Sequence, residues 1–212
     1  MRASTSKRRQ PRDSAFPGAA KVSRPKRLRC SNEGKSRLAG SKHRVFFALC
    51  PDDPVRAQIA QAARRMHRVT QGRRIPDEEL HLTLAFIGAV SEERLEHLLK
   101  PPSEIFPPAF LLTLDDWGLW TRKGIGWTGP SVVPASLRRL AEKLDSWLRA
   151  EGFDLERRTF AAHVTLVRHA RPVALPTFGT SIHWHVGDIA LMNSAVTADS
   201  ARYTVLGKYS LL

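Results

Sequence analysis

The sequence predicts an α+β fold made of two similar lobes, each an antiparallel sheet with helices on its outer face, enclosing a central cleft. Two observations carry this prediction. The pattern HLTLAF at residues 81–86 returns as HVTLVR at residues 163–168, and both copies lie in runs that alternate like β-strands. An amphipathic, helix-like stretch precedes each copy, so the same order of elements occurs in both halves of the chain.

The elements of the first half follow from hydrophobic period and capping signals. The apolar run at 45–50 is typical of a buried strand, and apolar residues then recur at spacings of four and three across 55–69, which predicts a helix with one buried face. The alternating run at 80–87 predicts the first His strand. A short helix over 91–99, opened by a serine and two glutamates, and a strand over 109–114 complete this half.

The elements of the second half are read in the same way. A strand interrupted by glycines is predicted over 124–129, and the clearest helical pattern of the chain runs over 134–148. Strands are expected near 159–167, which holds the second motif, near 185–192 and near 202–209. The second half therefore repeats the order of a helix followed by a His strand.

The positive charge of the chain is concentrated at its beginning. The 212 residues have a formal net charge of +14, but residues 1–44 carry 14 Lys and Arg against 2 acidic residues, which leaves +2 for the rest. With few large apolar residues and no hydrophobic period, residues 1–43 are predicted to be a disordered basic tail, and residues 44–212 to be the folded domain. An RNA-binding arm, a targeting peptide and a non-native extension are all compatible with the tail.

Composition also narrows the setting in which the protein works. The two cysteines, Cys30 and Cys50, lie in very different surroundings, so a disulfide framework is not expected and a reducing compartment is the default. No apolar stretch approaches the roughly 20 residues of a membrane helix. We expect a cytoplasmic monomer that makes no membrane contact.

The repeated motif predicts a site at the face that its two copies share. In a strand, residues i and i+2 point the same way, so His81 and Thr83 project together, and so do His163 and Thr165. The apolar residues between them point into a core and anchor each strand. We expect the two imidazoles to face each other across one phosphate group.

Three longer segments carry a family resemblance: IPDEELHLTLAFIGAV, RRTFAAHVTLVRHA and the C-terminal IALMNSAVTADSARYTVLGKYSL. They resemble the 2H phosphoesterase superfamily, and specifically the bacterial RNA 2′,3′-cyclic phosphodiesterases once described as 2′-5′ RNA ligases. The likeness runs from about Arg44 to Leu212. Ala162 stands where such proteins often have proline, and Asn193 and the loop after it differ from the usual Arg-Ser-Glu-Leu sequence. These departures affect the substrate preference that the resemblance implies more than the chemistry.

The chemistry of the expected substrate fits two histidines. A 2′,3′-cyclic phosphate opens when water attacks phosphorus in line with the departing ribose oxygen, so a base is needed on one side and an acid on the other, and imidazole serves as either near neutral pH. The resemblance implies His81 as the acid for the 3′ oxygen and His163 as the base for water, leaving a 2′-phosphate. The hydroxyls of Thr83 and Thr165 are expected to bind the nonbridging oxygens.

Arg168 is a candidate for phosphate binding on the strength of the resemblance. Strict alternation from His163 places it on the opposite side of the pleat, so this role requires that the strand ends or bulges before it. No cofactor or metal is expected, because no acidic cluster stands beside either motif histidine.

Other residues were considered for binding. Phe47 and Trp127 are candidates for stacking on a base. His183 and His185 form an H-x-H pair that lacks further metal ligands at a structural-site spacing. His169 lies either at the mouth of the cleft or in a solvated loop. Asp115 and Asp116 are interpreted as turn residues.

The leading function is hydrolysis of RNA 2′,3′-cyclic phosphate ends, with RNA ends or nucleotides as partners. A 2′-5′ ligase or phosphodiesterase, or an enzyme for small cyclic nucleotides, would use the same two histidines. A noncatalytic protein that holds RNA ends is the alternative from another class.

Overall fold

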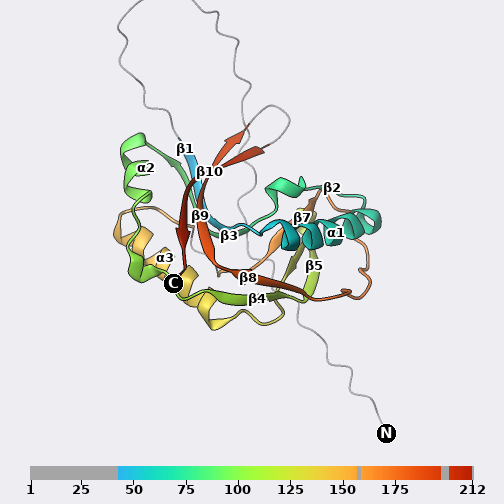
Figure 1. The fold of residues 1–212 in the computed structure, drawn as a ribbon. Helices are drawn as coiled ribbons and strands as arrows, with labels where there is room; N and C mark the ends of the chain where they lie inside the picture. Colours follow the sequence, from blue (N-terminus) through green and yellow to red (C-terminus); the bar gives the residue numbers. More distant parts are fainter. Residues whose placement is uncertain (1–42, 157–158, 197–200, 212) are drawn as a thin grey trace, which may run out of the picture. The chain divides into compact units, whose positions relative to one another are not determined.

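The computed structural model describes residues 43–156, 159–196 and 201–211. These residues form one large antiparallel sheet, a two-stranded sheet and three α-helices (Figure 1). The α+β prediction is confirmed. The predicted tail, residues 1–43, lies outside the described residues except for His43, where the first strand already begins.

The large sheet contains eight strands of the described chain. In spatial order they are β10 (Ala201–Ser210), β9 (Asp188–Val196), β1 (His43–Leu49), β3 (Leu82–Val90), β7 (Val164–Arg168), β6 (Ile125–Gly129) and β5 (Asp116–Trp120), with the short β2 (Arg73–Arg74) also paired to β7. The small sheet pairs β4 (Phe110–Leu114) with β8 (Ile182–Val186). The helices are α1 (Asp53–Thr70), α2 (Glu92–Leu98) and α3 (Ala135–Ala150), and single 3-10 turns occur at Asp77–Glu79, Ser103–Ile105 and Thr121–Lys123.

The structure corrects two of the sequence-based assignments. The strand predicted near 185–192 is two strands, β8 and β9, which meet at Gly187 and belong to different sheets. Asp116 is not a turn residue but the first residue of β5, where its carbonyl accepts a hydrogen bond from the Thr128 hydroxyl at 2.8 Å. Asp115 does lie between strands, and its carboxylate accepts from the amide and hydroxyl of Ser131.

The two lobes are two halves of the large sheet. We call β1, β3, β9 and β10 the first lobe and β2, β5, β6 and β7 the second lobe. The ladder between the described parts of β3 and β7 is the single pair Leu82–Val164, which joins the lobes. The helices are exchanged, because α1 from the first half of the chain packs against β7, while α3 from the second half packs against β3. Neither half of the sequence therefore completes a lobe by itself.

The helices follow from the expected capping and periodicity. The Asp52 carboxylate accepts the amide of Val55 at 3.0 Å at the start of α1, and Pro54 occupies the first turn, where no amide hydrogen is needed. One face of each long helix is buried in the main core: Val55, Ile59, Ala63 and Met66 of α1 and Leu137, Leu140, Leu144 and Leu148 of α3. None of the described helices is long and apolar enough to span a membrane.

Strand β1 of the first lobe is buried on both faces from Val45 to Leu49. Val45, Phe47 and Leu49 of β1 point into the main core beneath the helices. Phe46 and Ala48 point the other way and form a second, smaller cluster with Ala190 and Met192, against which Tyr203 and Cys50 pack. This second cluster matters for the site, because it lies on the face opposite the helices.

Candidate functional site

The two motifs meet at the junction of the lobes. Leu82 and Val164, each the second residue of a motif, are directly paired and fully buried in the main core. Their neighbours in each motif therefore point to the other side of the sheet. Because β3 and β7 are antiparallel, this register sets His81 opposite Thr165 and His163 opposite Thr83. The two histidines are then diagonal neighbours, a relation in which residues lie roughly 7–8 Å apart and their β-carbons somewhat closer.

We call the side of the sheet that carries His81, Thr83, His163 and Thr165 the motif face. It is the face on which the sequence places the predicted cleft. The arrangement brings the four predicted motif residues together, two from each lobe.

Both motif histidines are held by the same local hydrogen bond. His81 Nδ1 lies 2.6 Å from the carbonyl oxygen of Glu79, and His163 Nδ1 lies 2.7 Å from that of Ala161. A carbonyl only accepts, so Nδ1 carries the hydrogen in both rings and Nε2 is the nitrogen suited to exchange a proton with a ligand. The bond fixes the tautomer and the ring orientation of each histidine.

Aromatic rings surround His81. Its ring centroid lies 5.1 Å from that of Phe46 and 5.0 Å from that of Tyr203. Burial among these rings lowers the pKa of His81 below its ordinary value, the hydrogen bond to the Glu79 carbonyl opposes this, and the positive charge of Arg168 lowers the pKa further. Burial likewise raises the pKa of the Tyr203 hydroxyl. In the absence of a ligand, the neutral form of His81 is thus favoured.

His163 is enclosed by tryptophan. Its ring meets that of Trp120 edge to face at 4.6 Å, and Trp120 in turn packs against Trp127 at 5.6 Å. Gly118 makes this packing possible, since a β-carbon there would lie 2.4 Å from the indole of Trp127. Trp127 is on the motif face beside Thr165, but its ring is covered and only 8% exposed, which does not suit the predicted stacking on a base.

A β-bulge interrupts each motif strand at the same motif position. In β3, Thr83 pairs with Ala48 and Ala85 with Phe47, so Leu84 is an extra residue. In β7, Thr165 pairs with Trp127 and Val167 with Gly126, so Leu166 is an extra residue. Each bulge lets two successive residues point into the core and reverses the alternation that follows.

The bulges decide where the fifth residue after each histidine points. Arg168 is exposed and lies near enough to His81 and Tyr203 to shift the pKa of both groups. Strict alternation would have pointed Arg168 away from the motif face, and the bulge at Leu166 returns it to that face. Phe86 occupies the corresponding position in the first lobe and is 40% exposed, beside Phe46.

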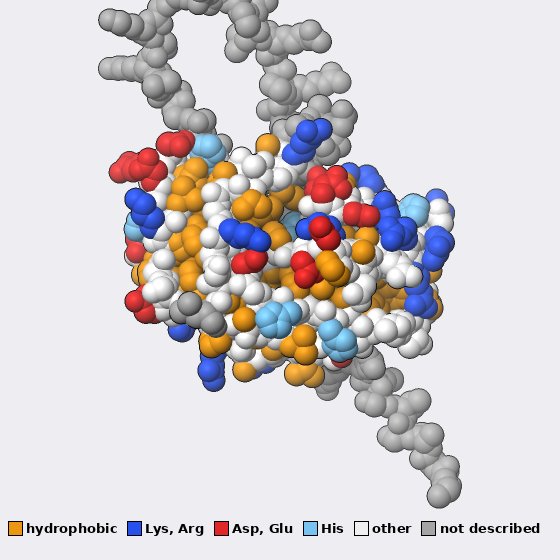
Figure 2. All heavy atoms as spheres, viewed as in Figure 1, with side chains coloured by type: hydrophobic (Ala, Val, Ile, Leu, Met, Phe, Trp, Pro, Cys, Tyr) orange, Lys and Arg blue, Asp and Glu red, His pale blue; other side chains and the backbone are white. Residues whose placement is uncertain are grey.

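Arginines gather next to this site. Arg73 pairs directly with Arg168 across β2 and β7. The pKa of Glu79 is raised by burial and by the neighbouring Glu78, and the positive charges of Arg73, Arg168 and Arg202 oppose this rise. Figure 2 shows further Lys and Arg side chains in the region of α1 and β2. In the sequence of α1, Arg64 and Arg68 are exposed. The second lobe therefore presents the positive charge of Arg73 and Arg168 next to the motif face, which sequence position alone did not indicate.

The remaining candidates lie elsewhere. The prediction that Phe47 stacks on a base is wrong, because its ring is fully buried in the main core against Trp147 and Tyr209. His183 and His185 are exposed on β8 in the small sheet, where His183 Nδ1 lies 3.4 Å from the Thr113 hydroxyl. His169 is exposed after β7, with a left-handed backbone conformation at φ 55°.

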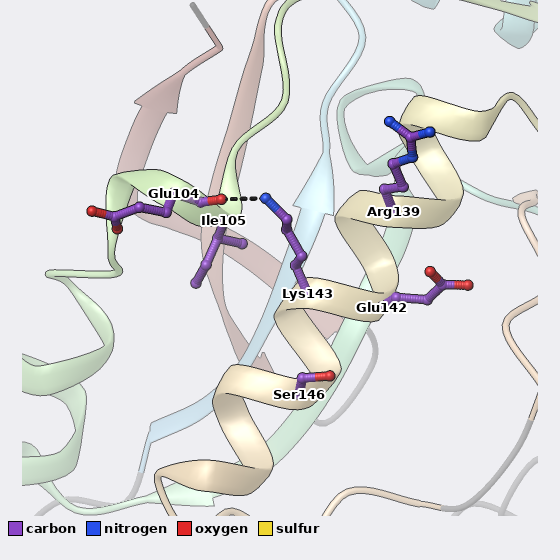
Figure 3. A pocket seen from close by; sticks show the side chains of 6 residues that line it. All are labelled: Glu104, Ile105, Arg139, Glu142, Lys143 and Ser146. Carbon is purple, nitrogen blue, oxygen red and sulfur yellow. Dashed lines mark hydrogen bonds between the residues drawn. The ribbon is translucent and has the colours of Figure 1, made fainter.

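In the described part of the chain, the groove of Figure 3 does not coincide with the motifs, and no group of metal ligands does either. Among the residues that the structure describes, no three His, Cys, Asp or Glu side chains are grouped so as to hold a metal ion. Figure 3 shows a groove between α3 and the turn Ser103–Ile105, where Lys143 donates to the Glu104 carbonyl. Its lining comes from the helix side of the sheet and contains no motif residue.

Comparisons with known proteins agree with this fold. Residues 49–127 match the family described as LigT like Phosphoesterase. The chain is 35% identical over 169 residues to the RNA 2′,3′-cyclic phosphodiesterase of Escherichia coli strain K12, covering 79% of this chain and 96% of the relative. It is 29% identical to the protein of the same name from Thermus thermophilus, covering 79% and 90%. The crystal structure of E. coli LigT complexed with 3′-AMP superposes with a TM-score of 0.73 at 34% identity, over 81% of this chain and 99% of that one.

The fold and these matches define the class of the protein, which is a phosphoesterase. More particularly, the chain belongs to the LigT-like phosphoesterase family.

Proposed function

We propose that this protein hydrolyses 2′,3′-cyclic phosphate ends of RNA to 2′-phosphates, with His81 and His163 as its acid and base. The observation that carries the proposal is the matched pair of Nδ1–carbonyl hydrogen bonds, at 2.6 and 2.7 Å, on two histidines set diagonally at one ladder pair. Both Nε2 atoms then serve one ligand on the motif face. No metal is part of the proposed reaction.

The reaction is one in-line displacement at phosphorus. His163 Nε2 takes a proton from water as the water oxygen bonds to phosphorus, and the bond from phosphorus to the 3′ oxygen breaks. His81 Nε2 gives its proton to that oxygen, so a 3′ hydroxyl and a 2′-phosphate result. Each histidine ends in the protonation state in which the other began, and proton exchange with water restores both.

The other motif residues bind the phosphate. The hydroxyls of Thr83 and Thr165 lie on the same face as the histidines and are suited to donate to the two nonbridging oxygens. Arg168 is exposed on that face after its bulge, and its guanidinium matches the charge that gathers on those oxygens. A bound phosphate anion also offsets the effect of Arg168 on His81, so His81 gains its proton together with the substrate.

The relatives support the choice of substrate. Those from E. coli and Thermus thermophilus are named RNA 2′,3′-cyclic phosphodiesterases, and E. coli LigT has been crystallised with 3′-AMP. The positive charge of Arg73 and Arg168 beside the motif face suits an RNA strand better than an uncharged ligand. We place the enzyme in the cytoplasm as a monomer, with residues 44–212 as its catalytic domain.

The direct test is an assay of the purified chain on nucleoside 2′,3′-cyclic phosphates, with the product identified by phosphorus NMR and chelator present throughout. The proposal expects a 2′-phosphate as the only product. His81→Ala and His163→Ala should each lose about 10²–10⁴ in rate. A protein that binds cyclic ends without turning them over, with or without both histidines, would be an RNA-end-binding protein instead.

A further inference from the structure

A second arginine lies directly beside Arg168. Arg73 of β2 and Arg168 of β7 are a cross-strand pair, so their side chains leave the sheet on the same face. Both side chains are exposed. Like charges that stand directly opposite each other in a ladder are destabilising. Such a pair therefore lowers the stability of the fold until an anion binds beside the two guanidinium groups.

No carboxylate of the described chain neutralises this pair. Arg74, the residue after Arg73, lies 3.7 Å from the carboxylate of Asp77 and is balanced in this way. Among the described residues, Arg73 and Arg168 form no such ion pair. Burial raises the pKa of Glu79 and both arginines oppose this rise, but the Glu79 carboxylate is not in direct contact with either. The two positive charges thus remain available to a ligand.

The segment that carries Arg73 also carries the proposed acid. It runs along one edge of β7, from the pairing of Arg73 with Arg168 to the ladder pair that joins the lobes beside His81. Burial raises the pKa of the Tyr203 hydroxyl and the charge of Arg73 opposes this, while the Tyr203 ring lies 5.0 Å from that of His81. An anion bound at Arg73 therefore adjoins the phosphate site without occupying it.

The cyclic phosphate itself does not require a second arginine. It has one negative charge and two nonbridging oxygens, for which the hydroxyls of Thr83 and Thr165 and the guanidinium of Arg168 are the proposed donors. An RNA strand brings a second phosphate one ribose away, the diester on the 5′ carbon of the terminal nucleotide. The β-carbons of directly paired residues lie roughly 4.5–5.5 Å apart, so two arginine side chains that spread from there can each hold one of two successive phosphates.

We propose that Arg73 binds the phosphodiester that joins the terminal nucleotide to the rest of the RNA, next to the cyclic phosphate held at Arg168. This inference rests on the proposed function and deepens it, because it makes a strand with an internal phosphate a better substrate than a nucleoside cyclic phosphate. The two arginines then distinguish a strand end from a mononucleotide by its charge. The diester also relieves the repulsion between the paired arginines of the free protein.

The test compares a mononucleotide with two dinucleotides that differ only in the charge of their linkage. The substrates are adenosine 2′,3′-cyclic phosphate, the dinucleotide ApA 2′,3′-cyclic phosphate, and the same dinucleotide with an uncharged methylphosphonate linkage. The wild type should favour the natural linkage over the methylphosphonate by about 5- to 15-fold in kcat/KM, between the effect of an exposed ion pair and that of a charged hydrogen bond.

Replacing Arg73 should remove this preference alone. Arg73→Gln should hydrolyse the two dinucleotides equally well and keep kcat/KM for adenosine 2′,3′-cyclic phosphate within about twofold of the wild type. Arg73→Lys keeps the charge without the planar fork and should retain part of the preference. Arg68→Gln is the matched control, because Arg68 is an exposed arginine of α1, a helix whose apolar face is buried in the main core.

Salt dependence and stability give two independent readouts. In the wild type, the slopes of log kcat/KM against log salt concentration should differ by about 0.7 between the charged and uncharged linkages, and in Arg73→Gln they should coincide. Arg73→Gln should not lower the melting temperature, because it removes one of two facing like charges. A fall larger than that of Arg68→Gln would mean that Arg73 supports the fold and would overturn the inference.

The outcomes separate this inference from the proposed function. An equal loss on all substrates in Arg73→Gln would mean that both arginines hold the cyclic phosphate, and an unchanged preference would mean that the diester binds elsewhere. Either result overturns the inference. If the wild type hydrolyses none of the substrates, the proposed function fails, and equilibrium binding of adenosine 3′-phosphate and adenosine 3′,5′-bisphosphate tests Arg73 directly. Tighter binding of the bisphosphate that is lost in Arg73→Gln supports the site, and a preference unchanged by the substitution overturns it.

Discussion

Replacing Arg168 by glutamine tests the bulge and the phosphate site together. Had β7 alternated strictly, residue 168 would point into the core, and Arg168→Gln would act mainly on stability. With Leu166 as the extra residue, Arg168 is exposed on the motif face, so stability should change by less than about 0.5 kcal/mol. The loss should instead appear in the reaction.

The size of that loss follows from the position of Arg168. Removing a preorganised donor to a developing oxyanion costs about 10²–10³ in rate, and an exposed guanidinium partly screened by water belongs at the lower end. We therefore expect a loss of about 10² in kcat/KM on a mononucleotide cyclic phosphate, or about 2.7 kcal/mol. Arg168→Lys keeps the charge without the planar fork and should lose about tenfold.

The assay is steady-state kinetics at fixed salt, with thermal unfolding of each variant as the stability readout. Arg139→Gln is the control, because Arg139 is an exposed arginine on α3 in the groove away from the motifs. If Arg168→Gln lost no more activity than Arg139→Gln, Arg168 would not contact the phosphate. A large fall in melting temperature with unchanged kinetics would refute the bulged register itself.

Three further predictions concern the tail, the pH profile and the roles of the histidines. Deleting residues 1–42 should leave turnover of a mononucleotide cyclic phosphate unchanged. If the tail is an RNA arm, the deletion should lower the affinity for longer RNA and the salt dependence of that affinity. Loss of mononucleotide turnover in a deletion variant that still folds would contradict the domain boundary. Burial lowers the pKa of His81, and an acid must be protonated, so kcat/KM should fall as pH rises through that lowered pKa. The fall of kcat should occur at higher pH, because bound phosphate favours the protonated form of His81. If kcat and kcat/KM fell at the same pH, this would argue against His81 as the acid. When sulfur replaces the 3′ oxygen of the substrate, the leaving group needs no proton. His81→Ala should then recover much of its lost rate, and His163→Ala should recover little of its lost rate. The opposite pattern would reverse the two roles.

The sequence allowed the motif pair to be predicted because period-2 alternation is a local property. It places His and Thr of each copy on one face without any knowledge of the partner strand. The exchange of helices between lobes was not accessible in this way, since α1 and α3 carry the same kind of apolar stripe and nothing in that stripe selects β7 or β3. Partner choice is a tertiary property.

The bulges interrupt the alternation of side chains, and they leave a recognisable pattern in the sequence. In both copies two apolar residues follow the threonine, Leu84 and Ala85 in one and Leu166 and Val167 in the other, and all four are buried. Two successive core residues in an otherwise alternating strand indicate a bulge, so this pattern could have placed Phe86 and Arg168 correctly. The phase of β1 offered no such signal, because its residues 45–49 are apolar throughout and buried on both faces, so the sequence does not reveal that Phe47 points into the core.

The division of labour between the two histidines must come from their surroundings. Their hydrogen bonds to backbone carbonyls differ by only 0.1 Å, and their strands are related by the same bulge and the same ladder pair, so backbone geometry treats acid and base alike. What differs is the set of neighbours. His81 lies near Arg168, which belongs to the other motif, so its proton affinity depends on whether that cation is balanced by a phosphate. A repeated strand can thus supply both proposed groups, while Arg168, which follows only one of the two copies, makes their surroundings unequal.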